Sequence, residues 1–247
     1  MPRDWDAATY DRIADPQVRW GTAVLDRLEF DGDGTVMDAG CGSGRVTELV
    51  AERFPNAEIL ALDGSASMIE QARGRLGRFG DRVTFVLADL MHPLPVAEPV
   101  DAVFSTATFH WVPDHEALFA NLAGAMRPAA RLIAQCGGAG NLTSVVRVLD
   151  ELGADTFSGK VFATPEETQA RLRRTGFADI ECWLHTEPTR FESLDALETF
   201  LRTVVLGEHV HGMSDEDAAA FTHAVASRLA GFELDYVRLN IGATRAG

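Results

Sequence analysis

The amino-acid sequence predicts an α/β fold: a doubly wound, mostly parallel seven-stranded sheet with N-terminal helices and a small helical cap. Apolar strands alternate with helices from residue 35 to residue 152, and this order changes after Gly153. Such alternation is typical of parallel sheets with helices on both faces. The 247 residues, 46% of them hydrophobic, suffice for one packed domain. We expect a helical lid at 1–30, a ligand-binding core at 31–153 and a C-terminal part at 154–247, with the cap near 193–230.

The hydrophobic pattern assigns the elements in order. The stretch from Trp5 to Leu28 has apolar residues at helical intervals, with Pro16 as a break between two helices. Strands follow at 35–39, 58–63, 82–87, 100–106 and 131–136, and helices at 45–53, 65–76, 114–126 and 142–152. The remaining elements are a helix at 165–174, a strand at 180–186, helices at 194–206 and 215–229, and a strand at 233–241. The two late helices are expected over the carboxyl ends of the strands, where α/β sheets bind ligands.

Charge and composition exclude several classes of partner. Lys and Arg number 22 against 37 Asp and Glu, so the net charge of -15 disfavours nucleic acid and anionic membrane surfaces. The three cysteines have no C-x-x-C spacing, and His209 and His211 do not share a helical face, so no metal site is expected. No apolar run approaches the ~18 residues of a membrane helix, and the first residues are polar. These features predict a cytoplasmic protein and leave its oligomeric state open.

A glycine-rich turn follows the first strand, in the sequence V-M-D-A-G-C-G-S-G from Val36 to Gly44. Glycines can adopt positive φ, so such a turn presents main-chain N–H groups to a ligand at the start of a helix. The second strand, I-L-A-L-D, ends in Asp63, which suits two ribose hydroxyls. Together these features predict an adenosine-containing cofactor. Arg45 stands where a dinucleotide-binding G-x-G-x-x-G would have its last glycine, which weakens an NAD reading.

Four strand ends resemble the motifs of class I S-adenosylmethionine-dependent methyltransferases. Residues 38–44, D-A-G-C-G-S-G, are similar to the first motif, whose loop holds the methionine part of the cofactor. Residues 62–68 resemble the second motif, 88–90 the third and 101–107 the fourth. Residues 122–135 resemble the fifth, with Ala-Ala where Gly-Gly is usual. The resemblance implies a Rossmann-like methyltransferase fold and S-adenosyl-L-methionine as cofactor.

The same resemblance implies which residues hold the cofactor. Asp63 would hold the ribose, Met68 would lie against adenine, and Asp89 would accept from the adenine amino group. The expected cofactor-binding residues are Tyr10, Asp38, Gly40, Cys41, Gly42, Asp63, Gly64, Met68, Asp89, Leu90, Ser105, Thr106 and Ala107. Singly, these residues have structural explanations: Asp63 could cap the next helix, and Met68 could be core. Four strand ends in the right order favour the cofactor.

The segment T-A-T-F-H-W-V-P-D after the fourth strand is expected to line the reacting end of the site. His110 is the candidate catalytic residue: it could accept a proton from a phenol, donate to an ionised carboxylate, or serve as a hydrogen-bonded histidine at a helix start. Trp111 and Arg202 are the candidate substrate-binding residues. Arg238 shares with Arg202 a guanidinium that suits an acid, and surface ion pairs are the alternative for both.

The string H-W-V-P-D-H-E-A-L, with W-D-A-A-T-Y near the N-terminus, resembles trans-aconitate methyltransferases and, more loosely, juvenile hormone acid methyltransferases. Both groups esterify small carboxylic acids. The resemblance implies methylation of a small-molecule acceptor, with O-methylation of a carboxylate favoured, and an N-terminal helix whose Tyr10 covers the cofactor. The alternatives are C- or N-methylation of a natural-product intermediate, or a partner protein that binds the cofactor without turnover.

Overall fold

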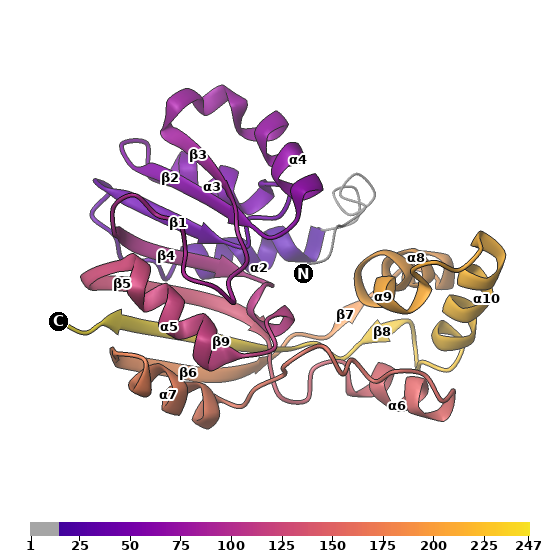
Figure 1. Ribbon diagram of the computed structural model, residues 1–247. Coiled ribbons are helices and arrows are strands. Elements are labelled where there is room, and N and C mark those ends of the chain that lie inside the picture. Colours follow the sequence, from indigo (N-terminus) through magenta and orange to yellow (C-terminus); the bar gives the residue numbers. More distant parts are fainter. Residues whose placement is uncertain (1–14) are drawn as a thin grey trace.

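A seven-stranded sheet forms the centre of the protein. The computed structural model describes residues 15–247 and orders the strands β3-β2-β1-β4-β5-β9-β6 (Figure 1). The strands are β1 (Thr35–Ala39), β2 (Glu58–Asp63), β3 (Val83–Leu87), β4 (Val100–Thr106), β5 (Met126–Gly137), β6 (Phe177–Thr186) and β9 (Val237–Arg245). β9 runs antiparallel to both its neighbours, while the pairs from β3 to β5 are parallel. The predicted doubly wound, mostly parallel seven-stranded sheet is confirmed.

Helices cover both faces of this sheet (Figure 1). The helices are α2 (Asp15–Leu25), α3 (Arg45–Arg53) and α4 (Ala66–Leu76) on one face, and α5 (His115–Ala125) and α7 (Pro165–Arg174) on the other. Because successive strand residues point to opposite faces, Val36 packs with the first group and Met37 with the second. Both side chains are fully buried. This double burial explains why the strands read as apolar runs.

A helical cap lies beyond the carboxyl ends of the parallel strands (Figure 1). It consists of α6 (Thr143–Glu151), α8 (Leu194–Phe200), the π-helical turn η3 (Leu201–Val205), α9 (Gly207–Val210), α10 (Asp215–Ala226) and a two-stranded sheet of β7 (Thr189–Arg190) and β8 (Glu233–Leu234). The cap has its own apolar core, to which Leu149, Phe200 and Val225 contribute and into which α2 inserts Trp20. In the part of the chain that the structure describes, no helix has the length and apolarity needed to cross a bilayer.

Most predicted elements have the observed bounds within a few residues, and the last strand is the main error. The predicted strand 233–241 is two strands: β8 pairs with β7, and β9 joins the central sheet. The interruption at Asp235 has a clear cause, because its carboxylate accepts from the Ser144 N–H at 2.9 Å and from the Ser144 hydroxyl at 2.5 Å. Asp235 thus anchors the start of α6 and leaves the ladder. The predicted helix 194–206 is α-helical only to Phe200, and α9 was not predicted.

Candidate active site

A cavity of about 560 Å³ lies between the carboxyl ends of the strands and the cap. Its volume is typical of a site for a small ligand. Many of the predicted site residues line it: Gly40, Gly42, Asp63, Gly64, Met68, Asp89, Leu90, Thr106, Ala107, His110 and Trp111. The cap contributes Val204, Val205 and Glu208. The topology therefore brings residues from four strand ends and from a late insertion to one space.

The glycine turn after β1 is fixed against the end of β2. Gly40 and Gly42 have φ values of 87° and 54°, in the left-handed region that favours glycine. The Gly40 N–H donates to the Leu62 carbonyl at 2.8 Å, and the Gly42 N–H donates to Oδ2 of Asp63 at 2.9 Å. A Cβ on Gly40 would lie 2.2 Å from Oγ1 of Thr108, in the loop after β4. The turn therefore tolerates no side chain at this position.

Two carboxylates line the cavity near this turn. Asp63 accepts from Ser65 N–H through Oδ1 at 2.8 Å, so it holds both the glycine turn and the start of α4. Burial raises the pKa of Asp63, against the lowering effect of these backbone N–H groups. Asp89, after β3, accepts from the Met91 N–H at 3.0 Å. A carboxylate oxygen has two lone pairs, so each acid can accept further bonds from a ligand.

Three predicted cofactor residues, Asp38, Cys41 and Ser105, do not line the cavity. Asp38 is buried and accepts from the Thr47 hydroxyl at 2.7 Å, and burial raises its pKa to about 7. Ser105 donates to the Ala39 carbonyl at 2.6 Å. The Cys41 thiol is buried, which raises its pKa. Any contact of these three with a ligand would have to come from the backbone, and Tyr10 lies outside the described residues.

His110 occupies the cavity wall on η2 (Phe109–Trp111), directly after β4. Its Nδ1 accepts a hydrogen bond from the Gly137 N–H at 3.3 Å, so the ring proton belongs on Nε2. Burial lowers the pKa of His110 well below its ordinary value, and the positive charges of Arg238 and Lys160 lower it further. The ring is neutral at physiological pH. It fits a hydrogen-bond donor and not a general base.

Two cations lie close to this histidine. Arg238 on β9 is buried, donates from Nε to Oε1 of Gln135 at 3.3 Å and places its guanidinium 4.3 Å from the centre of the Trp20 ring. Lys160, whose side chain is 5% exposed, has Nζ 4.3 Å from the centre of the Trp111 ring. Both line the cavity. Trp111, which was predicted to bind substrate, thus lies in the cavity wall with its ring against the Lys160 ammonium group.

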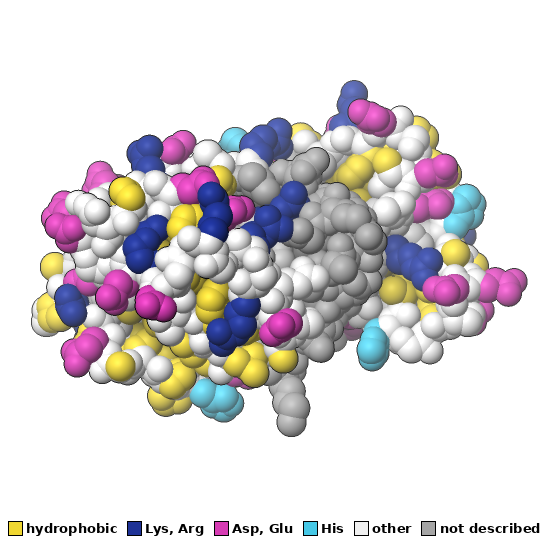
Figure 2. Space-filling model, turned by 90° about the horizontal axis from the view of Figure 1, so that it is seen from above, with side chains coloured by type: hydrophobic (Ala, Val, Ile, Leu, Met, Phe, Trp, Pro, Cys, Tyr) yellow, Lys and Arg dark blue, Asp and Glu magenta, His cyan; other side chains and the backbone are white. Residues whose placement is uncertain are grey.

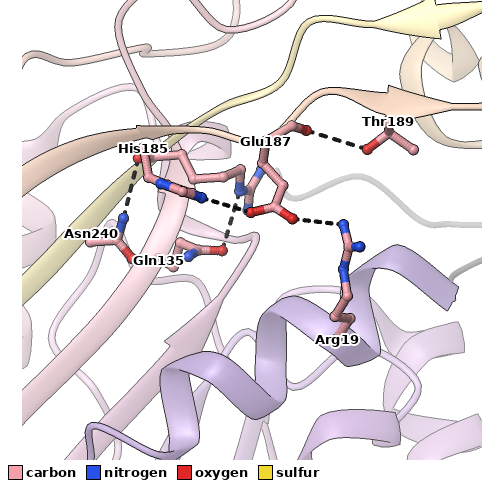
Figure 3. Close-up of polar contacts among 7 residues, drawn as sticks. Arg19, Gln135, His185, Glu187, Thr189 and Asn240 are labelled. Carbon is pink, nitrogen blue, oxygen red and sulfur yellow. Dashed lines mark hydrogen bonds and ion pairs between the residues drawn. The ribbon is translucent and has the colours of Figure 1, made fainter.

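Polar contacts join the ends of β5, β9 and β6 on this side of the sheet (Figure 3). Gln135, which accepts from Arg238, donates to Asn240 at 2.9 Å and so joins β5 to β9. Glu187, just after β6, pairs with Arg19 of α2 at 2.7 Å and with Nε2 of His185 at 3.0 Å. These bonds tie the N-terminal helix to the edge of the sheet (Figure 3). The Arg238 side chain itself is held by Gln135 of β5 and by the ring of Trp20 on α2.

Arg202 is not where we expected it. It belongs to η3, and its guanidinium pairs with Asp215 at 2.6 Å on the outside of the cap, away from the cavity lining. The Asp215 side chain is 99% exposed, so this is a surface ion pair. Arg238 holds the position that the sequence analysis gave to Arg202. Lys160 was missed, although one signal existed: it is the one lysine in a chain with 21 arginines.

The charges of the cavity contrast with those of the surface. On the face shown in Figure 2, Asp and Glu side chains lie over both the core and the cap, interspersed with Arg. Within the described cavity lining, Asp63 and Asp89 lie near the glycine turn, while Arg238 and Lys160 flank His110 at the other end, with Glu208 beside Lys160. Among the described residues there is no cluster of three or more His, Cys, Asp or Glu suited to a metal ion.

Known proteins are similar to this chain in sequence or in fold. The family described as methyltransferase domain matches residues 36–129. A trans-aconitate 2-methyltransferase from Methylobacterium radiotolerans is 38% identical over 132 residues, or 53% of this chain and 49% of that protein. Another, from Methylobacterium nodulans, is 33% identical over 183 residues, or 73% of this chain and 67% of that protein. The matched part of the chain spans about half the length of most of these curated relatives.

The fold has solved counterparts. A phosphoethanolamine N-methyltransferase 2 from Haemonchus contortus, in complex with phosphomonomethylethanolamine and S-adenosylhomocysteine, has a TM-score of 0.64 and 21% identity. The likeness covers 97% of this chain and 56% of that one, and at this identity it concerns the fold alone. The family assignment rests on the Methylobacterium nodulans relative and on the matched methyltransferase domain. The chain belongs to the class I S-adenosylmethionine-dependent methyltransferases.

Proposed function

We propose that the protein transfers the methyl group of S-adenosyl-L-methionine to a carboxylate oxygen of a small molecule. The observation that carries this proposal is the neutral His110, with a donor at Nε2, flanked by Arg238 and Lys160. In a chain of net charge -15, two cations in one cavity wall favour an anionic acceptor. The curated relatives named trans-aconitate 2-methyltransferase support an acid as acceptor.

The cofactor end of the cavity fits S-adenosyl-L-methionine. Gly42 lines the cavity, and a Cβ there would have no atom of residues 15–247 within 4 Å other than its chain neighbours, so a ligand can approach the bare backbone. Asp63 supplies carboxylate lone pairs for ribose hydroxyls, and Asp89 supplies them for an amino group. Met68, which is buried and lines the cavity, offers an apolar surface for a flat ring. Residues 1–30 remain our candidate for a lid over this end.

The residues at the other end would bind and orient the acceptor. Arg238 and Lys160 attract its carboxylate, and Nε2 of His110 donates to one oxygen and holds the acid in a fixed orientation. When bound, the cofactor supplies a methyl group on a sulfonium, which the other carboxylate oxygen takes by in-line displacement while the carbon–sulfur bond breaks. An ionised carboxylate needs no base, which agrees with the engaged Nδ1 of His110. An amine that arrives as an ammonium ion, or a carbon acid, would need a base, a role that the engaged Nδ1 of His110 does not favour.

The proposal is tested by transfer of label from methyl-labelled cofactor to a panel of small acids. A methyl ester releases labelled methanol in mild alkali, whereas methyl ethers and methylamines keep their label. We expect alkali-labile label that depends on both enzyme and acid. Alkali-stable product would contradict a carboxylate acceptor. Tight cofactor binding with no labelled product from any acid or extract would favour a binding protein without turnover.

A further inference from the structure

Glu208 brings a negative charge into the acceptor end of the cavity. It lies on α9, directly after the π-helical turn, and lines the cavity. Its Oε2 is 3.3 Å from Nζ of Lys160. The Lys160 side chain is buried, whereas that of Glu208 is 42% exposed. The cap thus supplies a counter-ion for the lysine before any acceptor binds.

This pairing changes the charge that an acceptor meets. Of the described residues that line the acceptor end, Arg238 and Lys160 are positive and Glu208 is negative, so an anionic acceptor meets one acid there as well as two bases. The carboxylates of Asp63 and Asp89 lie at the other end, near the glycine turn. A second carboxylate would stand in a half-closed space with Glu208 as its neighbour and no further cation among these residues.

Several apolar side chains line this wall beside the polar Asn141 and Tyr236. The π-helical turn places two consecutive valines, Val204 and Val205, in the cavity lining, and Leu142 and Phe162 line it from the segments before α6 and α7. The Phe162 ring stacks on His110 with 6.0 Å between ring centres. An ionised or strongly hydrated group buried against these side chains would lose its water without gaining partners. The part of the acceptor beyond its reacting carboxylate is expected to be apolar.

We propose that the site selects acids with one ionised carboxylate and an apolar remainder, and that Glu208 is the residue that discriminates against polycarboxylates. This inference rests on the proposed function and specifies its substrate class. The selectivity proposed here differs from the substrate in the name of the curated relatives, because aconitate carries several carboxylates. Glu208 acts by electrostatic repulsion and by holding Lys160, so its role is in specificity and not in the chemical step.

Equilibrium binding tests this proposal without requiring turnover. Octanoate and trans-aconitate are titrated by calorimetry into the full chain saturated with S-adenosylhomocysteine. We expect octanoate to bind at least about 10-fold more tightly than trans-aconitate, and Glu208→Gln to shrink that ratio by about 10-fold. Asp215→Asn is the matched control, since it also removes an acid paired with a base on the cap, and it should leave the ratio unchanged.

The outcomes separate this inference from the proposed function. Tighter binding of trans-aconitate by the wild type, binding of neither acid, or an unchanged ratio in Glu208→Gln would each overturn the selectivity. Failure to form a methyl ester, with the binding preference intact, would instead overturn the proposed reaction. A melting curve checks that Glu208→Gln is folded. The wild-type preference provides a second measurement that needs no variant.

Discussion

The backbone N–H of Gly137, at the end of β5, donates to Nδ1 of His110 at 3.3 Å. This bond fixes the tautomer of the histidine from the neighbouring strand and leaves Nε2 as a donor toward the cavity. The position allows nothing larger than glycine, because a Cβ on Gly137 would lie 2.9 Å from the Phe162 ring. One backbone group thus decides which chemistry the candidate catalytic residue can perform.

We expect His110→Ala to lower kcat by about 10- to 100-fold, because a hydrogen bond to a charged group contributes about 1.5–3 kcal/mol. Cofactor affinity should stay nearly the same, since His110 faces the acceptor end. Steady-state kinetics with a carboxylic acid, together with calorimetric titration of S-adenosylhomocysteine, measure both. His211→Ala, an exposed histidine on the cap, is the control. Equal kcat in His110→Ala and wild type would assign His110 a purely structural role.

The pH dependence of the reaction should lack an ionisation of His110 near neutrality. Burial and two nearby cations lower the pKa of this ring well below its ordinary value. A lowered pKa means that the neutral, active form persists as the pH falls through 6.5 and is lost only at more acidic pH. We expect kcat to be flat from pH 8 to about 6.5. A fall centred near 6.5 that disappears in His110→Gln would show that the histidine works as a base.

Asp63→Ala should weaken S-adenosylhomocysteine binding by about 10- to 100-fold. The variant removes the acceptor proposed for ribose hydroxyls and also frees the Gly42 N–H, which donates to Oδ2 at 2.9 Å. Asp63→Asn separates the two effects, because its single carbonyl oxygen can serve the glycine turn or Ser65 but not both. Glu70→Ala, an exposed acid on α4, is the control. Unchanged affinity in Asp63→Ala would refute the ribose assignment.

Arg238 and Arg202 offer a matched pair of substitutions. Arg238→Lys should raise KM for the acid acceptor by about 10-fold, because lysine keeps the charge but loses the planar stacking on Trp20. Arg202→Lys should change KM by less than about 2-fold, since its partner Asp215 is at the surface and such pairs contribute about 0–1 kcal/mol. The two KM values are read from the same ester-forming assay. A larger effect at Arg202 would return the substrate-binding role to the cap surface.

The fold was predictable because its strands are apolar runs that end in recognisable residues. β1, β2 and β4 have the predicted bounds, since each is buried on both faces and stops at a turn or an acid. The bounds of the last strand were not predictable, because its interruption at Asp235 depends on Ser144, which is far away in the sequence. This break puts Arg238 at the start of β9. Since β9 is antiparallel, its start lies at the carboxyl edge of the other strands.

The acceptor end of the site was less predictable than the cofactor end. The predicted cofactor residues follow strand ends, so local pattern and order suffice to predict that they lie together at the cavity, as most of them do. Lys160 lies in the segment between α6 and α7, outside any periodic pattern, and meets Trp111 and Glu208 through tertiary packing alone. Nothing in the sequence showed that Arg202 would face outward and Arg238 inward. Only the fact that Lys160 is the one lysine of the chain could have drawn attention to it.

The stability of the protein should carry a pH dependence from Asp38. Burial raises the pKa of this carboxyl from its ordinary 3.8 to about 7, although it accepts a hydrogen bond from Thr47. The folded state therefore holds a proton that the unfolded state releases, so the contribution of Asp38 to stability is greatest at acidic pH. It is lost as the pH rises from about 4 to about 7, and above that an ionised carboxylate stays buried.

Asp38→Asn keeps an acceptor for Thr47 and removes this ionisation. We expect the variant to match the wild-type Tm at pH 5 or fall slightly below it, and to exceed the wild-type Tm by several degrees at pH 8, an effect of at most about 4 kcal/mol. Thermal unfolding at both pH values measures the difference, with Asp150→Asn, an exposed acid on α6, as control. The buried ionisation would be refuted by a Tm difference that is the same at both pH values. The comparison matters for function because Asp38 directly precedes the glycine turn, whose Gly40 and Gly42 line the cavity.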